Sequence, residues 1–534
     1  MTGVPPSSPP AAAAAASRPP GLARSTAIFS VATALSRVLG LVRESVSAYY
    51  FGSRGRINAF TVAFQIPNLV RALVADAALS GAFVPVFSEL VERGDRRRAW
   101  RVASTLFWLM LLLLGGLTAL FVVVAPYVLR LFGAPGGDLQ LAVGLSRVLF
   151  PIVVLLGLTG IVVGILNSHD HFTVPALSPV LWNVAIVVGL VLGVPTQEGE
   201  SGKLYVYAGS IVVGTLLQLL LPLPWLRGLD DRLRVAVDWR DPAVRRFFAL
   251  LLPVTLGLGL INVNAVIDTL FASRLIDATL APTAIDKAFR LYMLPQGMFS
   301  VAVATVLFPA LARLATRGDR AAFLDTVSLG LRQIAFMLVP AGAISAALAE
   351  PIVRVVYQRG EFTADQTTVV AGALAAFSLG LVFNGWMLML NRAFFSLQAS
   401  WLPTTVALGN LALNAALDAA LYRVGVWGIP LATSLVNIAG AATLAWLLRR
   451  RLGRLGLGRI AGSFVRVLAG SGVATGSAAA VWWGLDAALG RSFAGQALSL
   501  GGALACGAAA YVGAAALLRV QELESLRALL ALRR

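Results

Sequence analysis

Four arginines lie inside stretches of the sequence that are otherwise apolar enough to cross a membrane. They are Arg37, Arg43, Arg71 and Arg290. A charge at the centre of a spanning helix costs about 2.5–3.5 kcal/mol on insertion scales, so these side chains predict an interior lined by protein or water. The guanidinium group is always charged, and its planar fork matches two phosphate oxygens. We therefore expect a cationic cavity that suits a pyrophosphate or another multiply anionic head group.

Nearby carboxylates leave purely structural ion pairs open as an alternative. Arg37 and Glu44 are seven residues apart and could pair on one helix face, and Asp286 precedes Arg290 at the favourable i,i+4 spacing. Arg71 could reach the membrane surface with its long side chain. Ionisable residues within a membrane are functional by default, so we do not expect all of these residues to be structural.

A second polar group is formed by Asp268, Asn414 and Asp418 in two later apolar stretches. Carboxylate and amide oxygens are ligands for Na⁺, and a carboxylate can carry H⁺. The same residues could equally form a structural hydrogen-bond network. The sequence has no nucleophile–base pair, glycine-rich phosphate loop or Cys/His metal spacing, so we expect neither enzyme chemistry nor a cofactor beyond a coupling ion.

The composition is that of an integral membrane protein. Of the 534 residues, 58% are hydrophobic and 13% charged, where a soluble domain has about 25% charged residues. The single cysteine, Cys506, excludes an intramolecular disulfide. The net charge of +18 lies largely in short connecting loops, which indicates contact with anionic membrane lipids rather than nucleic acid.

We expect an all-α integral membrane protein with fourteen transmembrane helices. Pro67, Pro85, Pro295 and Pro309 are the obvious places for a helix break. Residues 1–24, rich in proline and alanine, predict a disordered tail with no cleaved signal. The apolar stretches that predict the helices are residues 22–51, 57–91, 102–132, 139–167, 175–195, 203–226, 243–276, 282–316, 322–350, 366–398, 401–422, 426–448, 460–489 and 494–519.

Arginine clusters predict the orientation in the membrane. They fall in residues 93–101, 227–246, 313–320 and 449–459, and each follows an even-numbered apolar stretch. Basic loops stay on the cytoplasmic side, so both termini should be cytoplasmic.

An internal repeat predicts two parallel bundles. Arg93-Gly94-Asp95-Arg96 matches Arg317-Gly318-Asp319-Arg320, with Pro85 and Pro309 at the same offset. Six predicted helices separate the copies, so the two halves have the same orientation and the substrate site should lie between them. The expected units are a six-helix bundle over residues 25–226, a cytoplasmic linker over 227–242, a second six-helix bundle over 243–448, and two appended helices with a tail over 449–534.

Several phrases resemble the MurJ/MviN family of lipid II flippases. They are S-R-V-L-G-L-V-R-E at 36–44, A-F-T-V-A-F-Q-I-P-N-L-V-R at 59–71, G-A-F-V-P-V-F at 81–87 and R-L-Y-M-L-P-Q-G at 290–297. The resemblance covers residues 25–520. It implies a multidrug/oligosaccharidyl-lipid/polysaccharide exporter fold with a central cavity.

The resemblance also implies a substrate and a location. The family moves lipid II, an undecaprenyl-pyrophosphate-linked disaccharide-peptide, from the inner to the outer leaflet of the bacterial cytoplasmic membrane by alternating access. Its functional arginines fall on the four named above, and its acidic positions on Glu44 and Asp76. Where the family often has an aspartate, this chain has Asn58, so an acidic role at that position is not carried over.

Three other functions stay open on the sequence. A flippase of another polyprenyl-pyrophosphate-linked oligosaccharide would need the same arginines, because its cargo bears the same pyrophosphate. A cation-coupled drug exporter of the same fold should have an acidic cavity instead. A membrane glycosyltransferase should offer paired acidic residues at the membrane surface, and the sequence has none.

Overall fold

The computed structural model describes residues 20–523, apart from residues 75–76, 170, 230, 400 and 454. Within these residues every regular element is a helix, as the sequence predicts. The expected tail over residues 1–24 lies mostly outside the described part. The α-helices are α1 (Pro20–Phe51), α2 (Ile57–Val74), α3 (Ala77–Glu92), α4 (Arg96–Arg130), α5 (Leu139–Leu149), α6 (Ile152–Ser168), α7 (Thr173–Val188), α8 (Glu200–Leu220), α9 (Pro242–Phe271), α10 (Ala281–Arg317), α11 (Arg320–Ala347), α12 (Ala349–Tyr357), α13 (Ala364–Leu379), α14 (Leu381–Ser396), α15 (Trp401–Leu421), α16 (Gly428–Leu452), α17 (Leu457–Leu489) and α18 (Phe493–Leu517).

Ten segments of the described chain are long and apolar enough to cross a membrane, and the bent pair α13–α14 makes eleven. The helices α1, α2, α3 and α9 do not meet this criterion, although they cover three of the predicted stretches. The structure therefore supports a multispan membrane protein. The count of fourteen spans stays a prediction.

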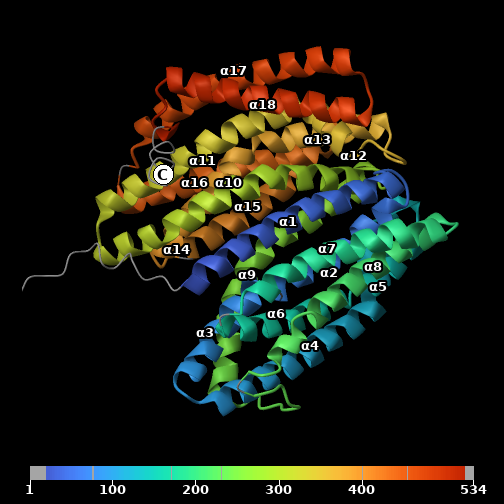
Figure 1. Ribbon diagram of the computed structural model, residues 1–534, viewed down its shortest axis with the longest axis vertical. Coiled ribbons are helices and arrows are strands. Elements are labelled where there is room, and N and C mark those ends of the chain that lie inside the picture. Colours follow the sequence, from blue (N-terminus) through green and yellow to red (C-terminus); the bar gives the residue numbers. More distant parts are fainter. Residues whose placement is uncertain are drawn as a thin grey trace, which may run out of the picture.

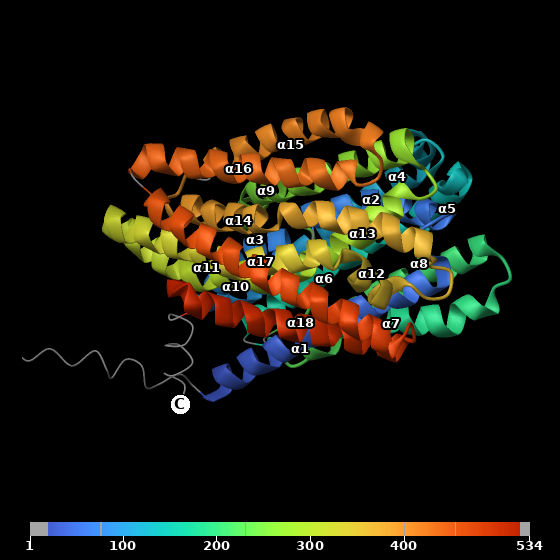
Figure 2. The ribbon, with the colours of Figure 1, turned by 90° about the horizontal axis from the view of Figure 1, so that it is seen from above.

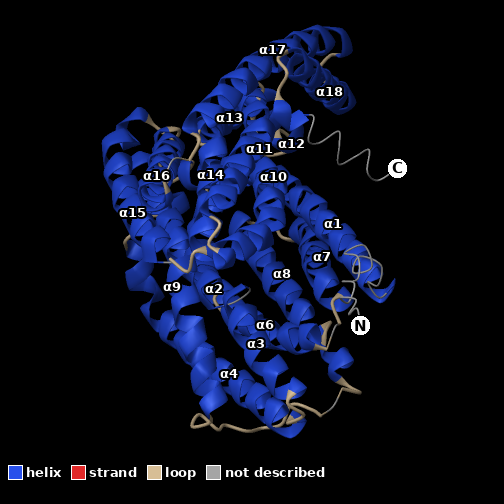
Figure 3. Ribbon diagram, turned by 90° about the vertical axis from the view of Figure 1, so that its left-hand side faces the viewer, coloured by secondary structure: helices blue, strands red, loops and turns tan. Residues whose placement is uncertain are grey.

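Buried apolar residues divide the helices into two groups. One large core is built almost wholly from α10 to α18, and two smaller cores come from α2 to α9. The helix α9 packs against α2, α3 and α15, so it contacts both groups. Figure 1 shows the groups side by side, with α1 and α9 between them, and Figure 2 gives the view from above. The hairpin of α17 and α18 packs on α11 at the outer edge of the molecule (Figure 3).

The two Arg-Gly-Asp-Arg copies adopt the same turn. Gly94 and Gly318 have φ angles of 79° and 70°, a left-handed conformation that glycine adopts without strain. The carboxylates of Asp95 and Asp319 then accept the backbone N–H of the third residue of α4 and of α11, at 3.3 and 3.0 Å. An aspartate at this position caps a helix by satisfying one of its free N–H groups. The repeat in the sequence is thus also a repeat of local structure.

The break between α13 and α14 comes from a side chain and not from proline. The hydroxyl of Ser434 on α16 donates to the carbonyls of Ala376 and Phe377, at 2.6 and 3.2 Å. A group inserted into the helical hydrogen-bond ladder bends the helix, here by 44° at Gly380. A side chain on Gly380 would meet the backbone of Ser434 at 2.7 Å. The four prolines named in the sequence lie within α2, α3 and α10 instead.

Candidate functional site

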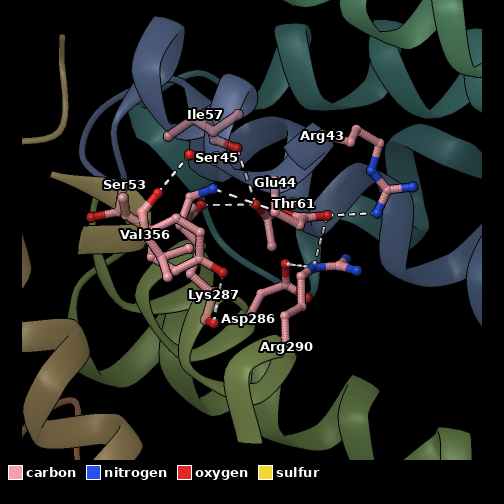
Figure 4. A network of polar contacts seen from close by, with 12 residues as sticks. Arg43, Glu44, Ser45, Ser53, Ile57, Thr61, Asp286, Lys287, Arg290 and Val356 are labelled. Atoms are coloured by element: carbon pink, nitrogen blue, oxygen red, sulfur yellow. Dashed lines mark hydrogen bonds and ion pairs between the residues drawn. The ribbon is translucent and has the colours of Figure 1, made fainter. Parts of the chain in front are cut away.

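A buried carboxylate, Glu44 on α1, gathers three cations. Its Oε1 lies 2.6 Å from Nη2 of Arg43 and 3.3 Å from Nε of Arg290, and its Oε2 lies 4.0 Å from Nζ of Lys287. Asp286 binds Arg290 from the other side at 2.8 Å, so the expected i,i+4 pair is present. Figure 4 shows Glu44 between Arg43 and the side chains of α10. These five residues carry three positive and two negative charges, so the cluster has a positive excess.

Aromatic rings hold two of these cations in place. The guanidinium of Arg43 lies 4.7 Å from the ring centre of Trp182 on α7. The ammonium of Lys287, whose residue is 2% exposed, lies 5.0 Å from the ring centre of Tyr357. A cation over an aromatic face is attracted by the ring quadrupole, most strongly where water is excluded. The cluster is therefore built from α1, α7, α10 and α12.

Lys287 is the member of this cluster that sequence reasoning missed. It follows Asp286 near the start of a predicted helix, where a lysine would normally face water. The signal that could have found it is its spacing of three residues before Arg290, which places both on one helix face.

The alternative pairing of Arg37 with Glu44 does not occur in the structure. Arg37 is exposed and its Nη2 donates to the backbone carbonyl of Gly297 on α10, at 3.3 Å. Seven residues of helix rise by about 10 Å, which places the Arg37 head group well away from a carboxylate that Arg43 and Arg290 already bind. Arg37 therefore connects α1 to α10 at a second point, in addition to the contact between Glu44 and Arg290.

Arg71 lies apart from the Glu44 cluster. Its Nε and Nη2 both bind Oδ1 of Asn68, one turn earlier on α2, at 3.1 and 3.0 Å. Asp76, the other acidic residue expected at the site, lies outside the described residues. The structure thus brings together Arg43, Glu44 and Arg290 directly and Arg37 on the same helix pair. It does not show Arg71 joining them.

The three residues expected to bind an ion do meet, between α9 and α15. The amide Nδ2 of Asn414 donates to Oδ1 of Asp268 at 2.6 Å and to Oδ2 of Asp418 at 2.9 Å. Asn414 and Asp418 are both fully buried. Among the described residues, Oδ1 of Asn414 and Oδ1 of Asp418 have no hydrogen-bond partner. Buried polar atoms are normally satisfied, so these two oxygens leave acceptor capacity for a cation or a proton.

Asn58 joins the two helix groups at one end. Its Nδ2 donates to the carbonyls of Thr279, Ser53 and Gly55, at 2.5, 3.1 and 3.1 Å, and its Oδ1 accepts the N–H of Thr283 at 2.9 Å. An aspartate could not donate to these three carbonyls, which explains why an amide serves at this position in this chain.

Further backbone contacts close the same end. The hydroxyl of Ser45 donates to the Val356 carbonyl at 2.6 Å, and the N–H of Glu361 donates to the Tyr49 carbonyl at 2.9 Å. The N–H of Gly55 donates to the Thr279 carbonyl at 2.7 Å. Ser45 directly follows Glu44 on α1, so the charged cluster lies next to the contacts that hold this end together.

Two groups of long apolar helices, joined at one end beside a buried charged cluster, define a multispan membrane transporter. Solved transporters share this fold. A structure of the lipid II flippase MurJ in an inward closed conformation superposes with a TM-score of 0.75, covering 92% of this chain and 98% of that one at 24% identity. An inward-facing multidrug transporter of the MATE family gives 0.65, covering 80% of this chain and 98% of that one at 18% identity.

The sequence comparisons are more specific than the fold. A family model described as the lipid II flippase MurJ matches residues 47–498. A probable lipid II flippase MurJ of Synechocystis sp. is 31% identical over 484 residues, covering 87% of this chain and 90% of the relative. The lipid II flippase MurJ of Burkholderia cenocepacia is 33% identical over 400 residues, covering 73% and 76%. The chain belongs to the MurJ lipid II flippase family, as its motifs predicted, and is a transporter and not an enzyme.

Proposed function

We propose that this protein moves lipid II from the inner to the outer leaflet of the bacterial cytoplasmic membrane by alternating access. The observation that carries the proposal is the cluster around Glu44, whose three cations, two of them buried and Arg290 half-buried, exceed its two carboxylates. A pyrophosphate is the part of lipid II that such a cluster can recognise, because charge-assisted hydrogen bonds to guanidinium groups are strong and directional.

The binding of a pyrophosphate to this cluster would also weaken the contacts at the end where the two helix groups are joined. Glu44 and a pyrophosphate would compete for Arg43 and Arg290. When the pyrophosphate draws these arginines away, Glu44 and the adjacent Ser45 lose the contacts that position α1 against Val356. A ligand shifts a conformational equilibrium only through such differential contacts. In this proposal Arg37 and Arg71 line the path of the head group, and Asp76 contributes from within the second predicted helix.

The finer architecture belongs to the same proposal. Fourteen spans in two parallel six-helix bundles, with α17 and α18 appended, would place both termini in the cytoplasm and the arginine-rich loops on that side. The shared turn at Gly94 and Gly318 and the division of the buried cores support this arrangement.

We further propose that Asp268, Asn414 and Asp418 couple the cycle to Na⁺ or H⁺. An outward-moving anion is favoured by a negative-inside potential, by about 2.3 kcal/mol per charge per 100 mV. The return of the empty, positively charged carrier is then the costly half of the cycle. A cation held by the two unpartnered buried oxygens would bias this return if it binds one state more tightly.

A flippase of another polyprenyl-pyrophosphate-linked oligosaccharide remains the alternative that the arginines alone do not exclude. A cation-coupled drug exporter is disfavoured, because a cationic drug would be repelled by the positive excess of this cluster.

Genetic complementation tests the proposal. In a bacterium depleted of its own lipid II flippase, this chain as the only copy should restore growth and clear the lipid II that accumulates in the inner leaflet. Growth without clearance, or clearance of a different lipid-linked oligosaccharide alone, would refute lipid II as the cargo.

A further inference from the structure

The connection between α8 and α9 is held against α4 by specific hydrogen bonds. The backbone N–H groups of Arg234 and Asp238 donate to the hydroxyls of Ser104 and Thr105, at 3.0 and 3.2 Å. The indole N–H of Trp108 donates to the Arg234 carbonyl at 3.0 Å. Ser104 and Thr105 are almost completely buried, so α4 offers two buried hydrogen-bond acceptors to the backbone of this connection. We call residues 231–241 the strap.

The far end of the strap is fixed by an ion pair. Asp241 caps α9 and binds Arg98 on α4 at 3.0 Å. The hydrogen bond from this guanidinium holds the pKa of the Asp241 carboxyl below its usual range. The strap is therefore part of the folded structure over its whole length.

A cavity of about 500 Å³ lies between the strap and the first turns of α4. Four arginines line it, namely Arg97, Arg101, Arg232 and Arg234, against one carboxylate, Asp231. Asp231 pairs with Arg234 at 3.2 Å. Arg97, Arg101 and Arg232 are exposed and form no ion pair with the residues that the structure describes. The cavity therefore presents three guanidinium groups outside this ion pair and has a positive excess over its one carboxylate.

The second copy of the repeat shows that the fold does not require these arginines. At the offset that aligns Gly94 with Gly318, Arg97 corresponds to Ala321 and Arg101 to Asp325. Both copies form the same capped turn. Arg97 and Arg101 are therefore not needed to form or cap the turn at the start of α4.

Aromatic and apolar side chains place the cavity at the membrane surface. Val235 and Trp239 on the strap are 80% and 62% exposed, and Trp225 just before it is 45% exposed. Trp108 lies one turn beyond Ser104 in α4, which is apolar enough to span the bilayer. Tryptophan collects at the level of the lipid head groups, and exposed apolar side chains beside it enter the interface. The arginines of the cavity lie at the level where phosphate groups occur.

We propose that this cavity binds the phosphate head group of an anionic phospholipid, such as phosphatidylglycerol. Arg97, Arg101 and Arg232 donate hydrogen bonds to the phosphate oxygens, while Val235 and Trp239 contact the upper acyl chains. Basic pockets beside spanning helices bind anionic head groups because their positive charge lies at the level of the lipid phosphates. The bound lipid joins α4 to the connection between α8 and α9, independently of the cargo that the protein moves.

The test is a binding titration on the full-length protein in neutral detergent. Thermal melting is followed while phosphatidylglycerol, phosphatidylcholine or inorganic phosphate is added. Phosphatidylglycerol should raise the melting temperature of the wild type far more than phosphatidylcholine. R97A/R101A should weaken its apparent affinity by about fivefold for each arginine removed. The matched control R313A/R317A removes two exposed arginines beside the second copy of the turn and should leave the affinity unchanged.

Arg232→Ala provides a second variant on the strap, because it leaves α4 intact. Its melting temperature without lipid should equal that of the wild type, while its affinity for phosphatidylglycerol falls about fivefold. Equal affinities for the two lipids, equal losses in the control, or the same stabilisation by inorganic phosphate alone would overturn the assignment to a lipid head group.

Discussion

At the scale of single residues, the site depends on how one carboxylate is shared. Glu44 binds Arg43 and Arg290 and lies 4.0 Å from Lys287. The sequence identified two of these arginines and the carboxylate, because charges in apolar stretches are conspicuous. It could not assign the partners of Glu44, since helix spacing alone offered Arg37 for Glu44 and Asp286 for Arg290. Lys287 was hidden because its burial depends on Tyr357, which is seventy residues away in the chain.

Lysine should not support lipid II binding in place of the arginines of the cluster. Arg43→Lys and Arg290→Lys keep the charge but lose the planar fork, so each should weaken the binding of lipid II to the purified protein by about tenfold. Arg313→Lys, at an exposed position in the last turns of α10, serves as the control and should bind as the wild type does. Normal binding by both cluster variants would reduce these arginines to structural ion pairs.

Glu44 and Lys287 should be energetically coupled. Glu44→Gln leaves buried cations without their counter-charge and should destabilise the protein by about 3–5 kcal/mol, as broken buried pairs do. Lys287→Met removes one such cation with little change of volume, so the double variant should recover part of the loss. Thermal melting of the four proteins measures the coupling. Strictly additive changes would show that the 4.0 Å contact contributes nothing.

At the scale of elements, hydrophobicity predicted the helices but not their breaks. All fourteen apolar stretches are helical where described, because stretches of this length and composition satisfy their backbone groups internally. The break at Gly380 was missed, since it depends on the hydroxyl of Ser434 from another helix. The role of Asn58 was also invisible, because its three acceptor carbonyls come partly from the start of α10.

The joined end should depend on Gly360. This glycine has a φ of 58°, and a side chain there would lie 2.3 Å from the Tyr49 carbonyl. Gly360→Ala should therefore separate α1 from the loop before α13 and increase the labelling of a cysteine placed at Thr283, in a background where Cys506 is alanine. Gly133→Ala imposes similar backbone strain, at φ 79°, but meets no neighbour. Equal labelling of the two variants would assign the effect to strain and not to the contact.

At the scale of the whole molecule, the two helix groups meet beside a charged cluster with a positive excess. The sequence predicted the family, since motifs such as those at residues 36–44 and 59–71 are local and specific. It could not predict which end is joined, because that depends on hydrogen bonds between loops of different halves, such as those of Tyr49 and Thr279. In the proposed cycle, opening this end would break those contacts, and the energy would come from cargo, ion or potential.

Asp418→Asn should slow turnover without weakening cargo binding. The substitution replaces a carboxyl group beside Asp268 and Asn414 by an amide, on helices other than those of the Glu44 cluster. Lipid II binding in detergent should be unchanged, while transport in proteoliposomes under an imposed Na⁺ gradient and potential should fall about tenfold. Asp365→Asn, an exposed residue at the start of α13, is the control. Wild-type transport by Asp418→Asn under every gradient would make the three residues an ordinary hydrogen-bond network.

The central claim is that this chain moves lipid II through the charged cluster between α1 and α10. Its most direct test measures the transfer of fluorescent lipid II between leaflets of proteoliposomes that contain wild type or Arg290→Lys. We expect transfer by the wild type well above protein-free liposomes, and a rate about tenfold lower for the variant. Transfer at equal rates by the two proteins, or none by correctly folded wild type, would contradict it.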